Sequence, residues 1–295
     1  MNDLEFIDGD FFENLADFSF ENYGKPLFFY CKEFDEFLIK SKVKLEKEKN
    51  SDGYDPDAQG YLETPIIIFC ETHRYREMLR RIVYIPRNVV LITHNSDVSI
   101  TDIPIWPKNL IHWFSQNVEV VHDKLTPIPI GLERKRWFPE LKKQETLREI
   151  MNIHYRKENL VYINFSTSTN PYRKEIIDSY RGKSWVTIQE DKISYKEYLE
   201  QIKKHYYVLS PEGNGIDCHR HWETLYCGSI PITQLSLTTL YAYNNIRMPR
   251  VSELKDLDYN FLESSKDNYN DCNFNQLCYY SDNISKDIKK YGNNT

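Results

Sequence analysis

Short apolar runs alternate with amphipathic stretches along most of this chain, and this alternation constrains its fold more than any other feature. The runs are rich in β-branched and aromatic residues, which is typical of buried strands, and the stretches between them have helical spacing. Strands that alternate with helices form α/β units around a parallel sheet. We therefore predict an α/β protein with strands at 27–31, 66–70, 89–93, 111–114, 125–130, 160–165, 185–188, 206–210, 230–233 and 246–251.

The pattern is interrupted by a polar helix predicted over 141–158, after which it restarts. A length of 295 residues suits one large or two medium domains. We predict a first α/β domain over 1–155, a second over 156–265, and a tail over 266–295 that either packs back on the first domain or frays. A polar, turn-rich stretch at 46–63 is expected to form a long loop.

The charge balance argues against nucleic acid as a partner. The chain has 44 acidic and 38 basic side chains and a net charge of −6, whereas nucleic-acid binders carry a basic field. The first residues are acidic, unlike a signal or transit peptide, and the longest apolar runs, at 65–70 and 88–93, are too short for a membrane span. Six cysteines without a C-x-x-C pair predict reduced thiols. We expect a cytoplasmic protein with no membrane span.

Unusual residues concentrate in the segment 208–233. A predicted strand ends at Ser210, Gly213 and Gly215 allow a tight turn, and a helix is expected to begin at 217–219. In an open α/β sheet, ligands bind beyond the carboxyl ends of the strands, and a helix N-terminus attracts anions. The segment therefore predicts a diphosphate site.

Arg220 and Glu223 are expected on one face of this helix, three residues apart. A guanidinium can hold phosphate oxygens through paired hydrogen bonds, and a carboxylate can accept the two hydroxyls of a ribose. The alternative is a solvated surface ion pair. The glycine-containing loop that precedes the helix favours the ligand-binding interpretation.

The same segment resembles the exostosin-type glycosyltransferases (glycosyltransferase family 47). Their donor-site signature runs L-x-P-x-G, then S-x-R-x-x-E-A, then G-x-x-P-V. The counterparts in this chain are residues 209–213, 218–224 and 228–232, in the same order and with the same spacing. Weaker similarities extend the resemblance from about residue 88 to 255, and the chain is most similar to the short, soluble members of the family.

The resemblance implies a GT-B fold, in which two Rossmann-like domains face a cleft. It also implies an inverting transfer, by direct displacement, from a UDP-sugar such as UDP-xylose to a hydroxyl of an oligosaccharide or glycan acceptor. The first domain would bind the acceptor and the second the nucleotide-sugar. The donor-binding residues it implies, together with those we place near them, are Arg220, Glu223, Ser210, Glu212, Gly213, Asp217, His219, Arg173 and Asn164.

An inverting transfer needs a general base near the acceptor hydroxyl. Asp97 and His94 are the first candidates, because they directly follow the predicted strand at 89–93, and Glu71 is the next. Each is also a residue type that caps helices or forms turns, so the choice among them stays open.

No metal or other cofactor is expected. The three Asp-x-Asp matches, at 8–10, 55–57 and 256–258, do not follow convincing strands and are interpreted as surface turns. A zinc site at Asp217, Cys218, His219 and His221 is disfavoured, because neighbours on a helix point in different directions and a second ligand pair is missing.

Two other functions are compatible with the pattern. A non-catalytic carbohydrate- or nucleotide-binding module on the same fold would bind ligands without transferring a sugar. A phosphate-handling hydrolase is disfavoured because the sequence contains no Walker loop.

Overall fold

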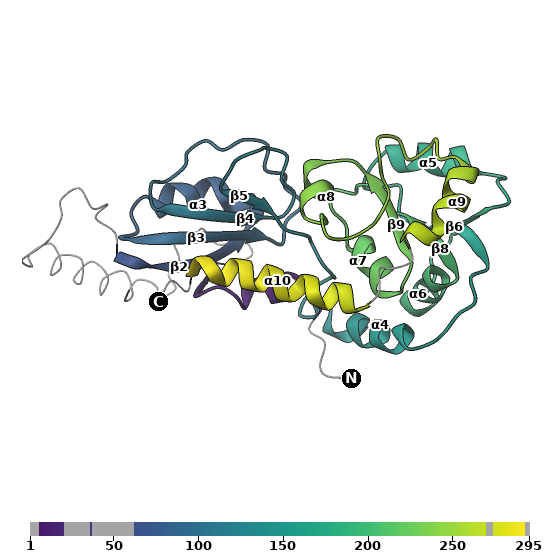
Figure 1. Ribbon diagram of the computed structural model, residues 1–295, viewed down its shortest axis with the longest axis horizontal. Helices are drawn as coiled ribbons and strands as arrows, with labels where there is room; N and C mark the ends of the chain where they lie inside the picture. Colours follow the sequence, from purple (N-terminus) through teal and green to yellow (C-terminus); the bar gives the residue numbers. More distant parts are fainter. Residues whose placement is uncertain (1–5, 21–35, 37–61, 270–273, 293–295) are drawn as a thin grey trace, which may run out of the picture. The chain divides into compact units, whose positions relative to one another are not determined.

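The computed structural model describes residues 6–20, 36, 62–269 and 274–292, which form two α/β units (Figure 1). The first-sheet unit takes the described residues of Phe11–Ile128 and Asn283–Thr295, and the second-sheet unit those of Met1–Asp10 and Pro129–Asp282. The division thus falls at residue 128, earlier than the predicted boundary at 155, because the helix in the intervening stretch packs on helices of the second sheet. The predicted strand at 27–31 and nearly all of the predicted loop at 46–63 lie outside the described residues.

The first-sheet unit is built on a parallel sheet whose strand order follows the chain, β1-β2-β3-β4-β5. Its core is formed by apolar side chains of β2, β3 and β4 and of the helix between the first two of these strands. The strands are β1 (Phe18–Phe20), β2 (Leu62–Glu71), β3 (Arg87–His94), β4 (Leu110–Ser115) and β5 (Leu125–Pro127), and the helices are α1 (Gly9–Glu13), which begins in the other unit, η1 (Thr72–Arg74) and α3 (Tyr75–Ile82).

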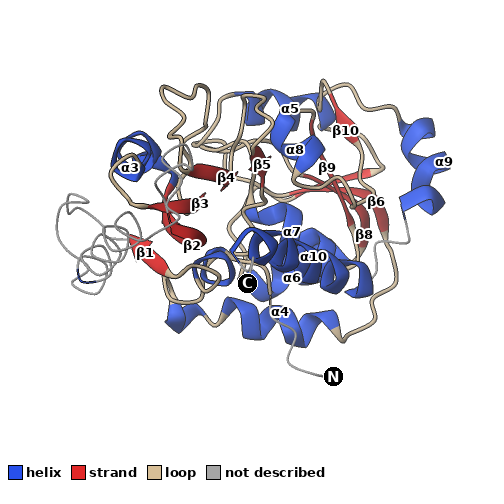
Figure 2. Ribbon diagram, turned by 60° about the vertical axis from the view of Figure 1, so that its left-hand side comes forward, coloured by secondary structure: helices blue, strands red, loops and turns tan. Residues whose placement is uncertain are grey.

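The second-sheet unit contains a parallel sheet of order β10-β9-β8-β6-β7. Its strands are β6 (Asn159–Ile163), β7 (Val186–Ile188), β8 (His205–Leu209), β9 (Ile230–Gln234) and β10 (Arg250–Val251). Its helices are η2 (Pro139–Leu141), α4 (Lys143–Met151), α5 (Tyr172–Tyr180), α6 (Tyr195–Lys203), α7 (His219–Tyr226), α8 (Leu237–Tyr241), α9 (Tyr259–Tyr269) and the first part of α10 (Phe274–Gly292), which continues into the other unit. Figure 2 shows β6, β8 and β9 side by side.

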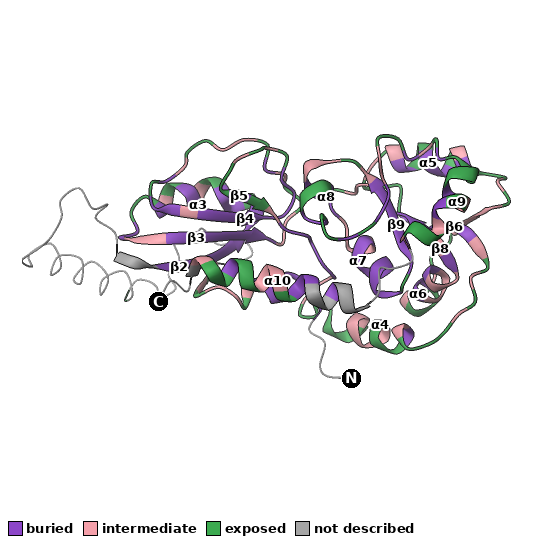
Figure 3. Cartoon of the chain, viewed as in Figure 1, coloured by how far each residue is buried: buried purple, intermediate pink, exposed green. Residues whose placement is uncertain are grey.

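The predicted α/β class, with two Rossmann-like parallel sheets, is confirmed by this topology. Each sheet buries most of its central strands, and in Figure 3 β3 is purple except at its first residues. Strands covered on both faces read as continuous apolar runs, which is why they were identifiable from the sequence. The predicted capping box of α6 is also confirmed, since the Ser194 hydroxyl accepts a hydrogen bond from the Glu197 amide at 3.2 Å and the Glu197 carboxylate accepts one from the Ser194 amide at 2.9 Å.

The two sheets differ in the order of their strands. In the described part of the first sheet the order is sequential, so neighbouring connections run in one direction. In the second sheet the chain goes from β6 outward to β7 and then returns to place β8 on the other side of β6. Loops diverge at such a switch point and leave a crevice at the carboxyl ends of the strands.

The end of the chain is more helical than its composition suggests. The tail predicted over 266–295 is mostly helical where the structure describes it, in the end of α9 and in α10. Both helices are polar in composition, so the sequence gives little indication of them. Each packs through a few fully buried side chains, such as Leu262 in α9 and Ile288 in α10.

Candidate functional site

A cavity of about 890 Å³ lies at the switch point of the second sheet. Its walls come from the residues that follow β6 and β7 and from the helices α6 and α7, with further residues from η2, α4 and α5. The lining combines acidic, basic and aromatic side chains, which are Leu141, Lys143, Asn164, Phe165, Ser166, Thr167, Ile177, Gln189, Glu190, Asp191, Lys192, Ile193, Ser194, Tyr195, Tyr198, Arg220 and Glu223.

Arg220 lies in the first turn of α7 and lines this cavity. Its Nε donates to the carbonyl oxygen of Asn164, directly after β6, at 3.1 Å. Its guanidinium carbon is 5.5 Å from the ring centre of Phe165, within cation–π range. The two contacts hold a permanent cation at the start of a helix, where the helix dipole adds to its attraction for anions.

Glu223 follows on the next turn of α7 and is 8% exposed. Its Oε2 accepts a hydrogen bond from the Tyr198 hydroxyl at 3.0 Å. Burial and the charge of Glu223 raise the pKa of Tyr195 and of Tyr198 well above the usual value. The hydroxyls therefore stay protonated at neutral pH, and the one on Tyr198 fixes the orientation of the carboxylate.

Arg173 was predicted among the donor-binding residues, and in the structure it is held by backbone carbonyls. Its three nitrogens donate to backbone carbonyls, Nε to Glu212 at 2.8 Å, Nη1 to Ser166 at 3.0 Å and Nη2 to Pro211 at 3.1 Å. Arg173 is 6% exposed and is absent from the cavity lining. Burial and the nearby Arg220 lower its pKa to about 10, so it remains a cation that ties the loop after β8 to the loop after β6.

Gly213 belongs to the loop that Arg173 holds. A Cβ built on this glycine would lie 3.0 Å from Nη2 of Arg173, a separation tighter than almost all real contacts of that kind. Gly213 thus allows the close approach of the guanidinium to the loop backbone. Its amide donates to the carbonyl of Gly215 at 3.0 Å, which closes the turn.

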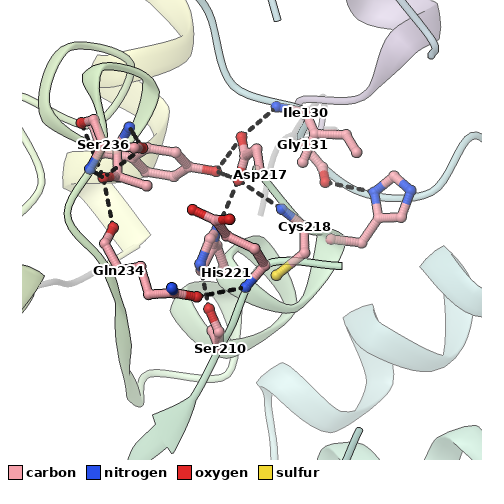
Figure 4. Close-up of polar contacts among 12 residues, drawn as sticks. Ile130, Gly131, Ser210, Asp217, Cys218, His221, Gln234 and Ser236 are labelled. Atoms are coloured by element: carbon pink, nitrogen blue, oxygen red, sulfur yellow. Dashed lines mark hydrogen bonds and ion pairs between the residues drawn. The ribbon is translucent and has the colours of Figure 1, made fainter. Parts of the chain in front are cut away.

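Asp217 is a buried structural carboxylate, although it was predicted near the donor. It pairs with Nδ1 of His221 at 2.6 Å and accepts hydrogen bonds from the Tyr243 hydroxyl, at 2.7 and 2.8 Å, and from the amides of Ile130 and Cys218, both at 2.8 Å (Figure 4). It is 3% exposed. Asp217 therefore anchors the start of α7 rather than lining the cavity.

The remaining predicted donor residues surround the same helix start. The carbonyl of Ser210, a fully buried residue, faces Nε2 of His221 at 3.2 Å. The ring of His219 hydrogen-bonds through Nδ1 to the carbonyl of Gly131 at 2.9 Å, and the Glu212 amide donates to the side chain of Gln234, the last residue of β9, at 3.3 Å. None of the three lines the cavity.

The predicted general bases belong to the first-sheet unit. Asp97 is exposed on the loop after β3. His94 is 1% exposed, its ring centre lies 5.0 Å from that of Phe12, and its Nδ1 is 2.8 Å from Oδ1 of Asn95. Glu71, at the end of β2, is also 1% exposed. Asp97 is therefore the member of this set that solvent reaches, and the choice of base stays a prediction.

Sequence reasoning missed most of the cavity lining, including Lys143, Tyr195 and Tyr198. The capping box at Ser194 already placed the start of α6 after β7, so helical spacing could have brought both tyrosines to the carboxyl end of the sheet. Lys143 has no such local signal, because it reaches the cavity from α4, before β6 in the chain. Its ammonium lies 5.4 Å from the ring centre of Tyr195 and pairs with Glu133.

Within the described ranges, no group of three or more His, Cys, Asp or Glu side chains is arranged to hold a metal ion. In the same part of the chain, every helix is too short or too polar to span a bilayer.

Comparisons with known proteins return only distant structural likenesses. No family model matches the chain, so the exostosin resemblance stays a prediction. No curated protein matches its sequence. An α1,3-fucosyltransferase structure is 11% identical, with 93% of this chain and 88% of that chain covered and a TM-score of 0.39.

Two further structures are similar at the same level. The α,α-trehalose-phosphate synthase (UDP-forming) from Burkholderia vietnamiensis is 8% identical over 90% of this chain and 77% of that chain, with a TM-score of 0.40. Anabaena Alr3699/HepE in complex with UDP-glucose is 9% identical over 77% of this chain and 76% of that chain, with a TM-score of 0.33. With TM-scores below 0.5, these likenesses carry no argument about function, which must come from the geometry of the site.

Proposed function

We propose that this protein is a glycosyltransferase whose second-sheet unit binds a nucleoside diphosphate sugar in the switch-point cavity. The observation that carries the proposal is that Arg220 and Glu223 line one cavity at the carboxyl ends of β6 and β7. Its volume of about 890 Å³ is within the range of about 300–1,000 Å³ that is usual for small-molecule sites.

The contacts of these two residues suggest separate roles. Arg220 would hold the diphosphate, because its guanidinium is fixed at the start of α7 by Asn164 and Phe165. Glu223 would accept the ribose hydroxyls, because Tyr198 orients its carboxylate from the other side. Arg173 would support the site without contacting the ligand, by donating hydrogen bonds to the backbone of the loop after β8.

The reaction we propose is the transfer of the sugar to an acceptor hydroxyl with inversion, in a GT-B arrangement. The acceptor would be an oligosaccharide or glycan, and a base from the first-sheet unit, Asp97 or else His94 or Glu71, would take the proton of the attacking hydroxyl. Arg220 and the N-terminus of α7 would stabilise the leaving diphosphate without a metal. UDP-sugars, including UDP-xylose, are the first donors to test, and GDP-fucose is the second class.

The experiment is a binding screen followed by a transfer assay. Ligands that bind only the folded state raise the melting temperature, so the wild type is heated with UDP, GDP, UDP-xylose, UDP-glucose and GDP-fucose. The best ligand is then titrated against Arg220→Ala. Loss of a charged hydrogen-bonding group costs about 1.5–3 kcal/mol, or about 10- to 100-fold in affinity.

Lys174→Ala is the matched control, because Lys174 is an exposed cation that pairs with Asp178 away from the cavity. It should bind the ligand as the wild type does. Unchanged binding by Arg220→Ala would refute the donor-site assignment. Tight binding without turnover of any donor would instead indicate a non-catalytic binding module, and activity that survives a chelator would support metal independence.

A further inference from the structure

One wall of the switch-point cavity carries side chains in a definite order. Arg220 and Glu223 lie on successive turns of α7. The Glu223 carboxylate accepts a hydrogen bond from Tyr198 at 3.0 Å, and the ring centres of Tyr198 and Tyr195, both on α6, lie 6.0 Å apart. The ammonium of Lys143, from the start of α4, lies 5.4 Å from the ring centre of Tyr195. All five side chains line the cavity, so the series begins with one cation and ends with another.

A nucleoside diphosphate has its parts in a matching order. The diphosphate is attached to C5′ of the ribose and the base to C1′, at the other end of the sugar ring. With the diphosphate at Arg220 and the ribose at Glu223, the base extends toward Tyr195 and Lys143. This step rests on the proposed function, which places the first two groups.

Lys143 supplies hydrogen-bond donors at this end of the series. An ammonium carries three N–H donors and no acceptor. Among the described residues, the Glu133 carboxylate is the acceptor that engages it, and this ion pair holds the ammonium in position. The ammonium therefore keeps donors for an acceptor atom of a ligand in the cavity.

Carboxylates near this end would favour the opposite type of base, one that donates hydrogen bonds. Glu133 is paired with Lys143. Glu190, on the loop after β7, accepts from both terminal nitrogens of Arg181, at 2.6 and 2.8 Å. Asp191 on the same loop is exposed, so water hydrates its carboxylate. The balance at this end of the cavity thus favours a ligand atom that accepts.

We propose that Lys143 makes the site selective for a base with a keto oxygen on its outer edge, as in uracil and guanine, over a base with an amino group there. O4 of uracil or O6 of guanine accepts a hydrogen bond from the ammonium. The exocyclic amines of cytosine and adenine are donors, so they leave the ammonium without an acceptor. A site built to hydrogen-bond one group rejects an analogue that lacks it, because the polar group of the protein is then left unpaired.

The test compares UDP with CDP, because uracil and cytosine have the same ring and differ in the carbonyl or amine at position 4 and the proton on N3. GDP and ADP form a second pair. Isothermal titration calorimetry on the wild type should give about tenfold tighter binding of UDP than of CDP, since a hydrogen bond to a charged group is lost. GDP should exceed ADP in the same direction. Equal affinities for UDP and CDP overturn the proposal.

Variants show whether Lys143 causes the preference. Lys143→Met keeps the length of the side chain and removes its charge, so the ratio of UDP to CDP affinity should fall to within about twofold. Lys143→Gln is a second neutral variant, in case the first does not fold, and its amide can donate or accept, so it too should lose the preference. A folded, neutral Lys143 variant that keeps the wild-type ratio overturns the assignment.

Lys135→Met is the matched control. Lys135 lies in the same segment of the chain and pairs with Glu145 as Lys143 pairs with Glu133, but it does not line the cavity. It should keep the tenfold ratio. A loss of stability alone does not change this ratio, because both nucleotides bind the same folded state.

The same titrations distinguish this inference from the proposed function. If none of the diphosphates UDP, CDP, GDP and ADP binds the wild type, the proposed function fails and the inference fails with it. If they bind without preference for the keto bases, the cavity is a nucleotide site as proposed and the role of Lys143 alone is refuted.

Discussion

The buried pair of Asp217 and His221 gives the sharpest prediction about stability. Replacing Asp217 by Asn keeps the shape of the side chain and removes its charge. The imidazolium of His221 then loses its counter-ion in a site with no exposed surface. Removing one partner of a buried ion pair costs about 3–5 kcal/mol, because the other charge stays buried and uncompensated.

The raised pKa of His221 gives a second estimate of how much its charge contributes to stability. Its pKa is about 10 in the folded protein, against an ordinary value of 6.5. At about 1.4 kcal/mol for each pKa unit, this difference corresponds to about 5 kcal/mol of stability that depends on the proton. Asp217 supplies part of this shift, since Cys218 also raises the pKa, so we expect Asp217→Asn to lower the free energy of unfolding by about 3 kcal/mol at pH 7.

The sign of the pH dependence follows from the direction of the shift. A group with a raised folded pKa stabilises the protein fully below its unfolded pKa, and this stabilisation is lost as the pH rises through the folded pKa. The wild type should therefore lose stability between pH 6.5 and about pH 10, by up to about 1.4 kcal/mol per pH unit. In Asp217→Asn the counter-ion that raises the pKa of His221 is gone, so this alkaline loss should become smaller.

Urea unfolding followed by tryptophan fluorescence at pH 7, 8.5 and 10 measures both effects. His112→Gln is the control, because His112 is a buried histidine of the first sheet whose pKa is lowered by burial to about 4. That variant should keep the alkaline slope of the wild type. Two results would show that Asp217 and His221 do not form a charged pair. One is an alkaline slope in Asp217→Asn equal to that of the wild type, and the other is a destabilisation below about 1 kcal/mol.

Three further changes test the surroundings of the site. Tyr198→Phe removes the donor to Glu223 at 3.0 Å, so the KM for the donor sugar should rise about 2- to 10-fold with kcat nearly unchanged, and an unchanged KM contradicts the role of the hydroxyl. Gly213→Ala places a Cβ at 3.0 Å from Arg173 and should cost about 1–3 kcal/mol in urea unfolding, whereas wild-type stability would show that the guanidinium can move freely. Gly131→Ala adds a Cβ at 2.3 Å from a backbone oxygen, at a φ of +70°, so little soluble protein should accumulate, and normal yield and melting temperature would refute the clash.

The elements of the second sheet were predictable to within a few residues for a local reason. β6, β8 and β9 are short apolar runs because both faces of a parallel sheet are covered. The capping box at Ser194 marks the start of α6 in the sequence. By contrast, β10 is a strand of two residues within the predicted 246–251. Its pairing with β9 depends on the neighbouring strand rather than on its own composition.

The candidate site was predictable in part. Arg220, Glu223 and Asn164 follow from the order of strand, loop and helix, and the structure brings all three to one cavity. Asp217 has the same polar character and lies near them in sequence, but it points into the protein and holds the helix start. Polarity in the sequence does not distinguish a ligand-binding carboxylate from a buried one that supports it.

The sequence alone determined the α/β class, the placement of most strands and the position of the loop and helix that carry Arg220, because periodicity and turn chemistry act over a few residues. Only the tertiary structure decided what each polar side chain does. Arg173 and Arg220 are both arginines in the first turn of a helix, yet three carbonyls from two loops surround Arg173 while Arg220 reaches the cavity. The physical reason is that a charged group is stabilised by whatever acceptors the fold brings to it, and those acceptors come from residues distant in the chain.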